Sequence, residues 1–353
     1  MTRELFRIDG LPVLQNRTFA SAAEATASVT GDVVLVQDER TGLVFNAAFD
    51  DSLLLYDADY QNEQACSPTF QKHLDDVASI IGSRFNGQRL LEVGCGKGYF
   101  LELLSGLGHD ITGIDPAYEG KSTGVLKVPF ESGMSLGADA IILRHVLEHI
   151  PDPQAFLADI ALANGGQGSI YIEVPCFEWI LRHHAWYDIF YEHVNYFRIA
   201  DFSRMFGRIF EQGHVFGGQY LYVVADLASL RSLQASHDRV RIPADFLLDI
   251  DRSASMIRDS GKNRNAIWGA ASKGVLFSIY MQRAGVGLDE AIDINPAKQG
   301  RYLAGSAVRV SSPADAACRL EDGDNIFVMN SNYLDEIIVQ SGGRYNYSTV
   351  QHG

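Results

Sequence analysis

The chain has 353 residues, of which 46% are hydrophobic, and this length favours two or three domains. Its net charge of -15 would repel the phosphate backbone of a nucleic acid, and we find no cluster of lysine and arginine that offsets this charge. No apolar run reaches the roughly 20 residues of a membrane span, and the N-terminus MTRELFRIDG is too charged for a signal peptide, so we expect a cytoplasmic protein that binds neither nucleic acid nor a membrane.

The predicted elements divide the chain into three parts. Residues 1–70 show short apolar runs and turns, as in DVVLVQDERTGLVFN, and predict a small β-rich lobe. A helix over 70–84 and then alternating strands and helices predict a Rossmann-like α/β domain over 71–225, with a parallel sheet covered on both faces. A charged and helical connection over 226–262 leads to a second Rossmann-like α/β domain over 263–353.

A glycine-rich loop follows the first apolar strand of the α/β part, in LLEVGCGKGYFLELL. Glycines at 94, 96 and 98 allow a ligand to approach the backbone, and the helix that follows offers free N–H groups to an anion. Asp115 ends the next strand, DITGID, where a carboxylate can accept the two hydroxyls of a ribose. The alternative is a tight turn with a purely structural role.

The spacing of this loop distinguishes the cofactor. Dinucleotide loops have the pattern GxGxxG, whereas this loop is ExGxGxG and resembles motif I of the class I methyltransferases. The resemblance implies S-adenosylmethionine as cofactor, with Glu92 near its amino-acid end. The expected cofactor contacts are Glu92, Gly94, Cys95, Gly96, Gly98, Tyr99, Asp115, Pro116, Arg144 and His145.

The segment His145-Val-Leu-Glu-His149 has the order of an inverted zincin zinc site. Zinc would need both histidines one turn apart on an established helix, but this segment directly follows the strand ADAIIL and precedes Pro151 and Pro153. We therefore expect no metal and no metal-dependent hydrolysis. Arg144 and His145 would instead lie beside the cofactor, while His149 either faces the substrate or caps a short helix.

Titratable side chains are crowded among aromatic rings over residues 183–197, HHAWYDIFYEHVNYF. A histidine with a near-neutral pKa beside a tyrosine and a carboxylate can take a proton, and the aromatic rings would exclude water. We interpret this segment as catalytic, although each of its polar residues alone is more often a satisfied, half-buried group.

With these motifs in place, the chain resembles the three-domain sugar C-methyltransferases, which methylate carbon 3 of nucleotide-linked keto-deoxysugars. YEHVNYF and the pair GAASKG and DINPAKQG carry the resemblance most specifically, together with GLPVLQN, YDADYQNEQACSPTF, RHVLEHI and MNSNY. It implies that His193 or Tyr191 removes the proton next to the ketone, and that Glu192, His149 and Tyr60 line the pocket and steady the enolate. Tyr56 could take the part of Tyr60.

The resemblance also assigns the nucleotide-sugar to the last domain. Lys273 in WGAASKG could receive a phosphate group, and the further expected substrate contacts are Asn195, Asn295, Lys298 and Tyr302. A purely structural Rossmann-like turn is the alternative for this loop.

One departure concerns zinc. Members of this family usually hold a zinc ion with cysteines in the first lobe, but residues 1–65 contain no cysteine, and the four cysteines at 66, 95, 176 and 318 form no CxxC pair. We therefore expect free thiols and no zinc. Two other functions stay open: O-methylation of a sugar or other small alcohol, and a non-catalytic protein that binds S-adenosylmethionine and a partner enzyme.

Overall fold

The structure is a computed structural model and describes residues 1–54 and 65–350. An antiparallel sheet with the order β1-β3-β4-β10 forms the first lobe. Its strands are β1 (Thr2–Pro12), β3 (Thr30–Asp38), β4 (Val44–Asn46) and β10 (Asn195–Tyr196). Because β10 belongs to the segment YEHVNYF, this sheet holds the expected catalytic segment against the first lobe.

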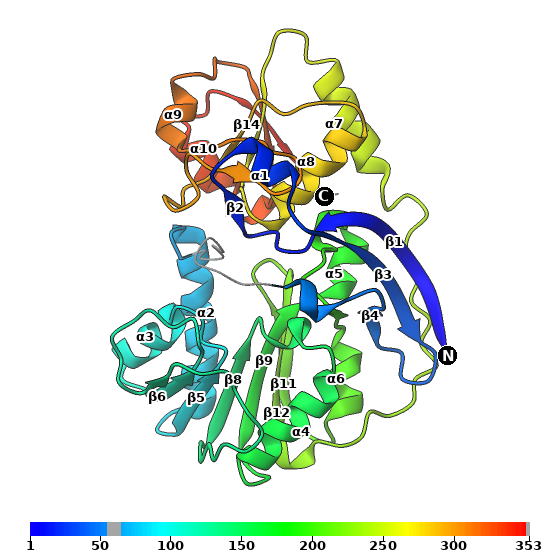
Figure 1. Ribbon diagram of the computed structural model, residues 1–353. Helices are drawn as coiled ribbons and strands as arrows, with labels where there is room; N and C mark the ends of the chain where they lie inside the picture. Colours follow the sequence, from blue (N-terminus) through cyan, green and yellow to red (C-terminus); the bar gives the residue numbers. More distant parts are fainter. Residues whose placement is uncertain (55–64, 351–353) are drawn as a thin grey trace.

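A seven-stranded sheet with the order β11-β12-β9-β8-β5-β6-β7 forms the core of the middle part of the chain, in the lower half of Figure 1. Its strands are β5 (Arg89–Val93), β6 (Asp110–Ile114), β7 (Val125–Leu126), β8 (Ala140–Arg144), β9 (Ser169–Pro175), β11 (Ile209–Val215) and β12 (Tyr220–Asp226). The five strands from β5 to β9 are parallel, as predicted.

The strands β11 and β12 are antiparallel to their neighbours, which corrects the prediction of a parallel sheet. The chain reverses between them at Gly217 and Gly218, whose φ angles are 65° and 85°. A parallel connection needs about a dozen or more residues, and this turn is too short for one.

Helices cover both faces of the central sheet, as predicted. Leu90 and Ile142 pack on the face of α2 (Pro68–Phe85) and α3 (Tyr99–Gly106), whereas the neighbouring residues Leu91 and Ile141 pack on the opposite face. That opposite face is covered by α4 (Pro153–Ala163), α5 (Phe177–Arg182) and α6 (Ile199–Met205). The period of two along each strand explains why both faces are apolar.

The last part of the chain folds as a second α/β unit, a parallel sheet with the order β16-β14-β13-β17-β18. Its strands are β13 (Asn265–Trp268), β14 (Glu290–Ile292), β16 (Val310–Ser311), β17 (Asn325–Val328) and β18 (Asn346–Thr349). Its helices are α8 (Ser272–Arg283), α9 (Pro313–Ala317) and α10 (Leu334–Gln340).

The connection before this unit is helical only in α7 (Leu248–Arg258), so the prediction of a helical connection over 226–262 is wrong for its first half. Residues 231–243 run without regular secondary structure along the first lobe, where the Gln37 side chain donates to the Asp238 carbonyl and accepts from the Val240 N–H. These contacts satisfy the backbone in place of helical bonds.

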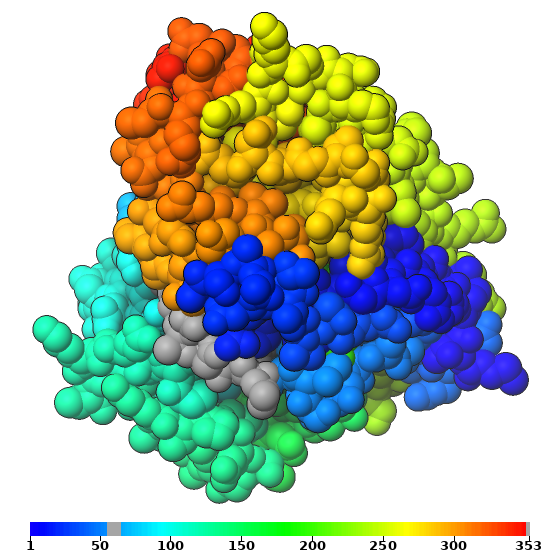
Figure 2. All heavy atoms as spheres, turned by 45° about the horizontal axis from the view of Figure 1, so that its top comes forward, coloured from blue at the N-terminus to red at the C-terminus, as the bar shows by residue number. Residues whose placement is uncertain are grey.

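The first lobe also contacts the last unit. The short strand β2 (Thr18–Phe19), next to α1 (Ala22–Thr26), pairs with β15 (Tyr302–Leu303). Figure 2 shows the N-terminal residues in dark blue, seated between the last unit and the central part. Among the described residues, the remaining elements are the 3-10 turns η1 (Asp51–Leu53), η2 (Leu147–His149), η3 (Trp186–Asp188), η4 (Leu227–Ser229) and η5 (Ser331–Tyr333).

Within residues 1–54 and 65–350, no helix combines the length and the apolar character that a membrane crossing requires.

Candidate functional site

A cavity of about 360 Å³ lies where the three parts of the chain meet. The central part contributes the glycine loop, the turn after β8 and the segment from Asp188 to His193. The last unit contributes residues around Gly269–Lys273 and Met329–Tyr333, and the first lobe contributes Asn16. The cavity therefore joins the expected cofactor loop to the expected substrate loop.

The glycine loop has the backbone that its sequence predicts. Gly94, Gly96 and Gly98 have φ angles of 76°, 54° and 91°, in the left-handed region that disfavours other residues. A Cβ atom on Gly98 would overlap the ring of Tyr118. Gly98 is also the N-cap of α3, so the start of this helix leaves backbone N–H groups beside the cavity.

Two carboxylates flank this loop in different ways. Asp115 accepts hydrogen bonds from the N–H groups of Gly96 at 2.8 Å and Ala117 at 2.7 Å, and these bonds fix the loop. Asp115 itself lies outside the cavity lining, and Pro116 beside it is exposed. Glu92 lines the cavity, is 2% exposed, and its Oε2 atom has no hydrogen-bond partner. Burial raises the pKa of Glu92 to about 7. Such a carboxylate fits the ammonium group of an amino-acid cofactor.

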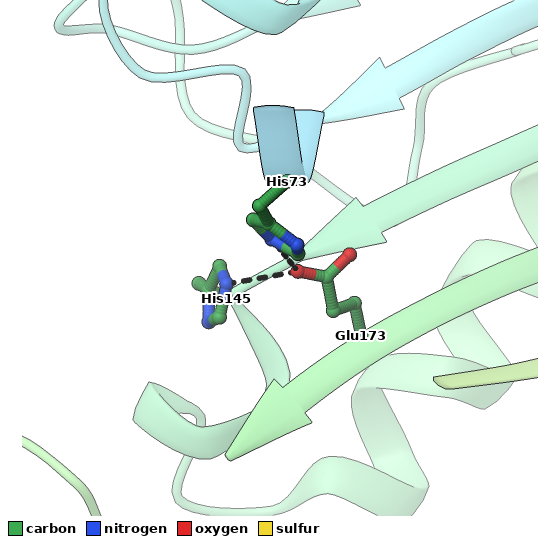
Figure 3. Close-up of side chains that lie close together, drawn as sticks. All are labelled: His73, His145 and Glu173. Atoms are coloured by element: carbon green, nitrogen blue, oxygen red, sulfur yellow. Dashed lines mark hydrogen bonds and ion pairs between the residues drawn. The ribbon is translucent and has the colours of Figure 1, made fainter. Parts of the chain in front are cut away.

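Two residues of the cavity lining, Arg144 and His145, belong to a buried hydrogen-bond network. Glu173, at the end of β9, is fully buried and accepts from both His73 and His145 through one oxygen, at 3.1 Å each (Figure 3). Arg144 donates to both oxygens at 3.2 Å, and Tyr171 donates at 2.8 Å. Burial alone would raise the pKa of Glu173, but Arg144 and the two histidines hold it well below its usual range.

This network does not suit a metal ion. The guanidinium of Arg144 already contacts both oxygens of Glu173, and its positive charge would repel a metal ion bound there. Burial lowers the pKa of His145, but its contacts with Glu148 and Glu173 outweigh burial and raise this pKa to about 9. His145 is therefore an imidazolium near neutral pH and a poor metal ligand.

The two histidines of the HxxEH segment also have separate contacts. His149 lies in the 3-10 turn η2, not on an α-helix, and its Nδ1 atom is 2.8 Å from the Glu192 carbonyl oxygen. Because a carbonyl oxygen can only accept, Nδ1 carries the proton in this hydrogen bond, and Nε2 of the neutral ring can accept a hydrogen bond. His149 lines the cavity, so it has the position that a substrate contact requires.

His193 lines the same cavity. Its ring lies on Phe190, with the two centroids 3.9 Å apart, and 5.1 Å from the ring of His149. Burial, the neighbouring ring of His149 and the positive charges of His145 and Lys273 lower the pKa of His193 well below its usual value. The imidazole is therefore neutral near pH 7 and able to accept a proton.

The structure does not bring the neighbours of His193 to the cavity. Tyr191 is fully buried, and its hydroxyl accepts from the backbone N–H of Asp50 and donates to the Asp50 carbonyl. Glu192 accepts the backbone N–H of Gln15 at 2.9 Å. Both side chains anchor the expected catalytic segment to the first lobe. The Asn195 amide donates to the Ile150 carbonyl, in the central part of the chain.

The last unit contributes two lysines to the cavity. Lys273, in the first turn of α8, lies 2.8 Å from Asp188 and above the rings of Trp179 and Tyr187. Lys298 is 3% exposed and also lines the cavity.

Of the other expected substrate contacts, Asn295 accepts the Ala297 N–H and Tyr302 lies in β15, both away from the cavity lining. Tyr60 and its alternative Tyr56 lie outside the described residues. Cys95 and Tyr99 line the cavity as expected.

The sequence motifs left several polar residues of the site unassigned, among them His73, Glu148, Glu173 and Asp188. A signal for Glu173 exists, because it is a charged residue near the end of the otherwise apolar strand IYIEVP. Glu148 lies within the HxxEH segment, three residues from its partner His145. His73 and Asp188 become recognisable only through their partners on distant segments.

Comparison with known proteins identifies the class of enzyme. Residues 60–209 match the family of methyltransferase domains, and residues 231–347 match the family of C-methyltransferase C-terminal domains. The chain is 26% identical to C-methyltransferase NovU of Streptomyces niveus over 325 residues, which cover 78% of this chain and 76% of the relative.

Two further similarities cover less of the chain. A ubiquinone biosynthesis O-methyltransferase of Maricaulis maris is 29% identical over 102 residues, which cover 24% of this chain and 40% of that protein. The crystal structure of a SAM-dependent methyltransferase from Aquifex aeolicus is 18% identical, with a TM-score of 0.37, and covers 46% of this chain and 95% of that one.

The protein is therefore a methyltransferase with the class I α/β fold, and it uses S-adenosylmethionine.

Proposed function

We propose that this methyltransferase adds its methyl group to a carbon atom, and that the acceptor is carbon 3 of a nucleotide-linked keto-deoxysugar. The similarity to C-methyltransferase NovU and to C-methyltransferase C-terminal domains supports transfer to carbon. The segments YEHVNYF and GAASKG, by their resemblance to the sugar C-methyltransferases, support the sugar.

The observation that carries the proposal is the position of His193. Transfer to carbon needs a base that removes a proton next to the ketone, because a neutral C–H group does not attack a methyl group. His193 is a neutral imidazole in the same cavity as the cofactor loop, and the Phe190 ring covers one of its faces. Such a group can take the proton, while Nε2 of His149 faces the same space.

S-adenosylmethionine, when bound, supplies an electrophilic methyl group on a positively charged sulfur. The residues of the chain hold and orient the two reactants: Glu92 and the N–H groups at the start of α3 would hold the amino-acid end. His193 removes the proton, and the aromatic surroundings exclude water from the reacting carbon.

The cations of the last unit support a negatively charged substrate. The overall charge of -15 disfavours anions, yet Lys273 and Lys298 both line the cavity, and Lys273 lies in the first turn of α8. A helix N-terminus with a lysine is a favourable environment for a phosphate group. The diphosphate of a nucleotide-sugar would meet this end of the cavity, with the sugar toward His193.

The test uses S-adenosylmethionine with a labelled methyl carbon and a thymidine diphosphate keto-deoxysugar. The carbon NMR spectrum of the product distinguishes a carbon-bound methyl group from a methoxy group. We expect a carbon-bound methyl group and, in deuterated water without cofactor, exchange of the C3 proton. Both should be lost in His193→Gln but kept in His214→Gln, which changes an exposed histidine on β11.

A methoxy product would favour the O-methyltransferase alternative, which the similarity over 24% of the chain to a ubiquinone biosynthesis O-methyltransferase keeps open. Exchange that is unchanged in His193→Gln would contradict the role of this histidine.

A further inference from the structure

Glu148 is a buried carboxylate in the turn η2. Its side chain is 1% exposed, and neither of its oxygens has a hydrogen bond of ordinary geometry. Its nearest cation is Nδ1 of His145, at 3.3 Å, which is long for a charge-assisted hydrogen bond. A buried charge with so few partners costs free energy, and proteins keep such groups where function needs them.

This carboxylate belongs to the cavity that holds the proposed base. Glu148, His149 and His193 all line it, and one carboxylate oxygen and one ring nitrogen from each histidine lie within 4.8 Å of one another. The peptide carbonyl of Glu192 orients His149 by its bond to Nδ1, and the backbone N–H of Val194 donates to the Glu148 carbonyl. These two hydrogen bonds therefore hold the turn η2 against the segment YEHVNYF.

We propose that Glu148 is a positioning residue for the reaction: its carboxylate stabilises the imidazolium that forms on His193 when this residue takes the proton from the substrate carbon. This inference rests on the proposed function. In this step the C–H bond breaks, an N–H bond forms on His193, and the electron pair stays on the substrate as an enolate. The enolate carbon then gains the methyl group, the sulfonium becomes a neutral thioether, and the proton leaves His193 for water.

The charges around the site explain why a carboxylate is needed. His145 and Lys273 already place positive charge near His193, so a second proton on this ring would be costly. An anion within ~6 Å of an imidazole offsets this cost. The other charged groups that line the cavity are Glu92 on β5, Lys97 in the glycine loop, Arg144 at the end of β8, Asp188 on η3 and Lys298, and Glu173 lies behind Arg144.

Most of these carboxylates are paired through short hydrogen bonds, whereas the contact of Glu148 with His145 is 3.3 Å long. Glu173 is bonded to Arg144, and Asp188 is bonded to Lys273. Glu92 lies beside the glycine loop, with Arg144 as its nearby cation. Glu148 is thus the carboxylate that the geometry places with the two histidines.

The test compares wild type with Glu148→Gln and Glu148→Asp. We expect Glu148→Gln to lower kcat and the rate of C3 proton exchange about 100-fold, with the KM values of both substrates little changed. The acid limb of the pH profile should move to lower pH, because the imidazole becomes less basic without its anion. Glu148→Asp keeps the charge and should recover part of the rate and of the pH shift.

Glu290→Gln is the matched control, since Glu290 is 4% exposed and pairs with Arg319 in the last unit. It should leave the pH profile unchanged. Binding of S-adenosylhomocysteine shows that each variant is folded. If Glu148→Gln does not fold, Glu148→Met offers a similar volume without the amide, with the same expected loss.

Three outcomes would overturn the inference. An active, folded Glu148→Gln with an unshifted pH profile would do so and leave the proposed function intact. Stoichiometric metal in the purified wild type, with activity lost to a chelator, would make Glu148, His149 and His193 metal ligands instead. A wild type that forms no carbon-bound methyl group would overturn the proposed function, and this inference with it.

Discussion

Lys273 Nζ lies 2.8 Å from Asp188 Oδ2, so an ion pair joins the last α/β unit to the central part of the molecule across the cavity. Both side chains are mostly buried, and the rings of Trp179 and Tyr187 lie within 5.5 Å of the ammonium group. The pair gives Lys273 a fixed position before any substrate arrives. An entering phosphate would share this cation with Asp188.

Replacement of Lys273 by methionine tests its role at the substrate end of the cavity. We expect the KM for the nucleotide-sugar to rise about 10-fold or more, because a charge-assisted hydrogen bond to phosphate is lost. Binding of S-adenosylhomocysteine, measured by calorimetry, should not change. Lys72→Met, an exposed lysine on α2, is the matched control and should leave both values unchanged. An unaltered KM in Lys273→Met would place the phosphate elsewhere.

Gly98 is expected to be irreplaceable in the cofactor loop. Its φ of 91° disfavours other residues, and an added Cβ would overlap Tyr118, which is fixed by bonds to Glu102 and to the Ser122 N–H. Gly98→Ala should lower the free energy of unfolding by about 1–3 kcal/mol and weaken binding of S-adenosylhomocysteine at least tenfold.

Gly87→Ala is the control for Gly98, because Gly87 also has a positive φ of 72° but no atom within 4 Å of an added Cβ. It should cost about 1–2 kcal/mol of stability and leave cofactor affinity unchanged. Equal affinities for both variants would show that the loop adapts to a side chain.

Glu173→Gln should be strongly destabilising, by about 3–5 kcal/mol, because it leaves the buried guanidinium of Arg144 without its anion. Tyr171→Phe removes one neutral donor from the same carboxylate and should cost only about 1 kcal/mol. Urea unfolding of the two variants provides the comparison. Similar losses would mean that Arg144 finds another partner.

The glycine-rich loops could be predicted from the sequence, because glycine spacing and the ends of apolar strands are local signals. Gly94 and Gly96 of the glycine loop, and Arg144, His145, Lys273 and Lys298, line the cavity, and their contacts with cofactor and substrate stay predictions. The pairing of Arg144 with Glu173 was not predicted, because these residues face each other only through the register of β8 and β9. Such a partner becomes visible once the strand order is known.

In the segment YEHVNYF, the local sequence does not predict which side chains reach the cavity. Tyr191 and His193 are two residues apart, so the sequence made both of them candidates for the base. A turn, closed by the His193 N–H on the Phe190 carbonyl, separates the two side chains. Tyr191 is directed to the backbone of Asp50, while His193 lines the cavity. The deciding contact comes from the first lobe, 141 residues away in sequence.

Chemical modification should divide the four cysteines into two pairs. Burial raises the pKa of Cys95 and of Cys176 to about 12 each, so few of these thiols are thiolates at pH 8, whereas Cys66 and Cys318 are exposed. Iodoacetamide should therefore modify two thiols in the native protein and four after unfolding, as counted by mass spectrometry. In a variant with serine at both exposed positions, rapid labelling of the native protein would contradict this expectation.

Binding of S-adenosylhomocysteine should become tighter as the pH rises toward 7. Burial raises the pKa of Glu92 to about 7, so this carboxyl is mostly protonated at pH 6, where it attracts the ligand's ammonium group less than a carboxylate would. His145, with a pKa of about 9, stays charged over this range and adds no slope. We expect the affinity to rise by up to about tenfold per pH unit below pH 7, and to level off before the ligand's own amino group deprotonates near pH ~8.

The stability of the free protein should change in the opposite direction. Because the pKa of Glu92 is higher in the folded than in the unfolded protein, its contribution is fully present below the unfolded value of 4.5 and is lost as the pH rises through about 7. Glu92→Gln removes the ionisation and should flatten both pH profiles while weakening the binding at pH 7.5. Calorimetry and urea unfolding at five pH values between 5.5 and 7.5 would measure the two slopes. A wild-type affinity that does not vary with pH, together with unchanged affinity in Glu92→Gln, would show that the ammonium group binds away from this carboxylate.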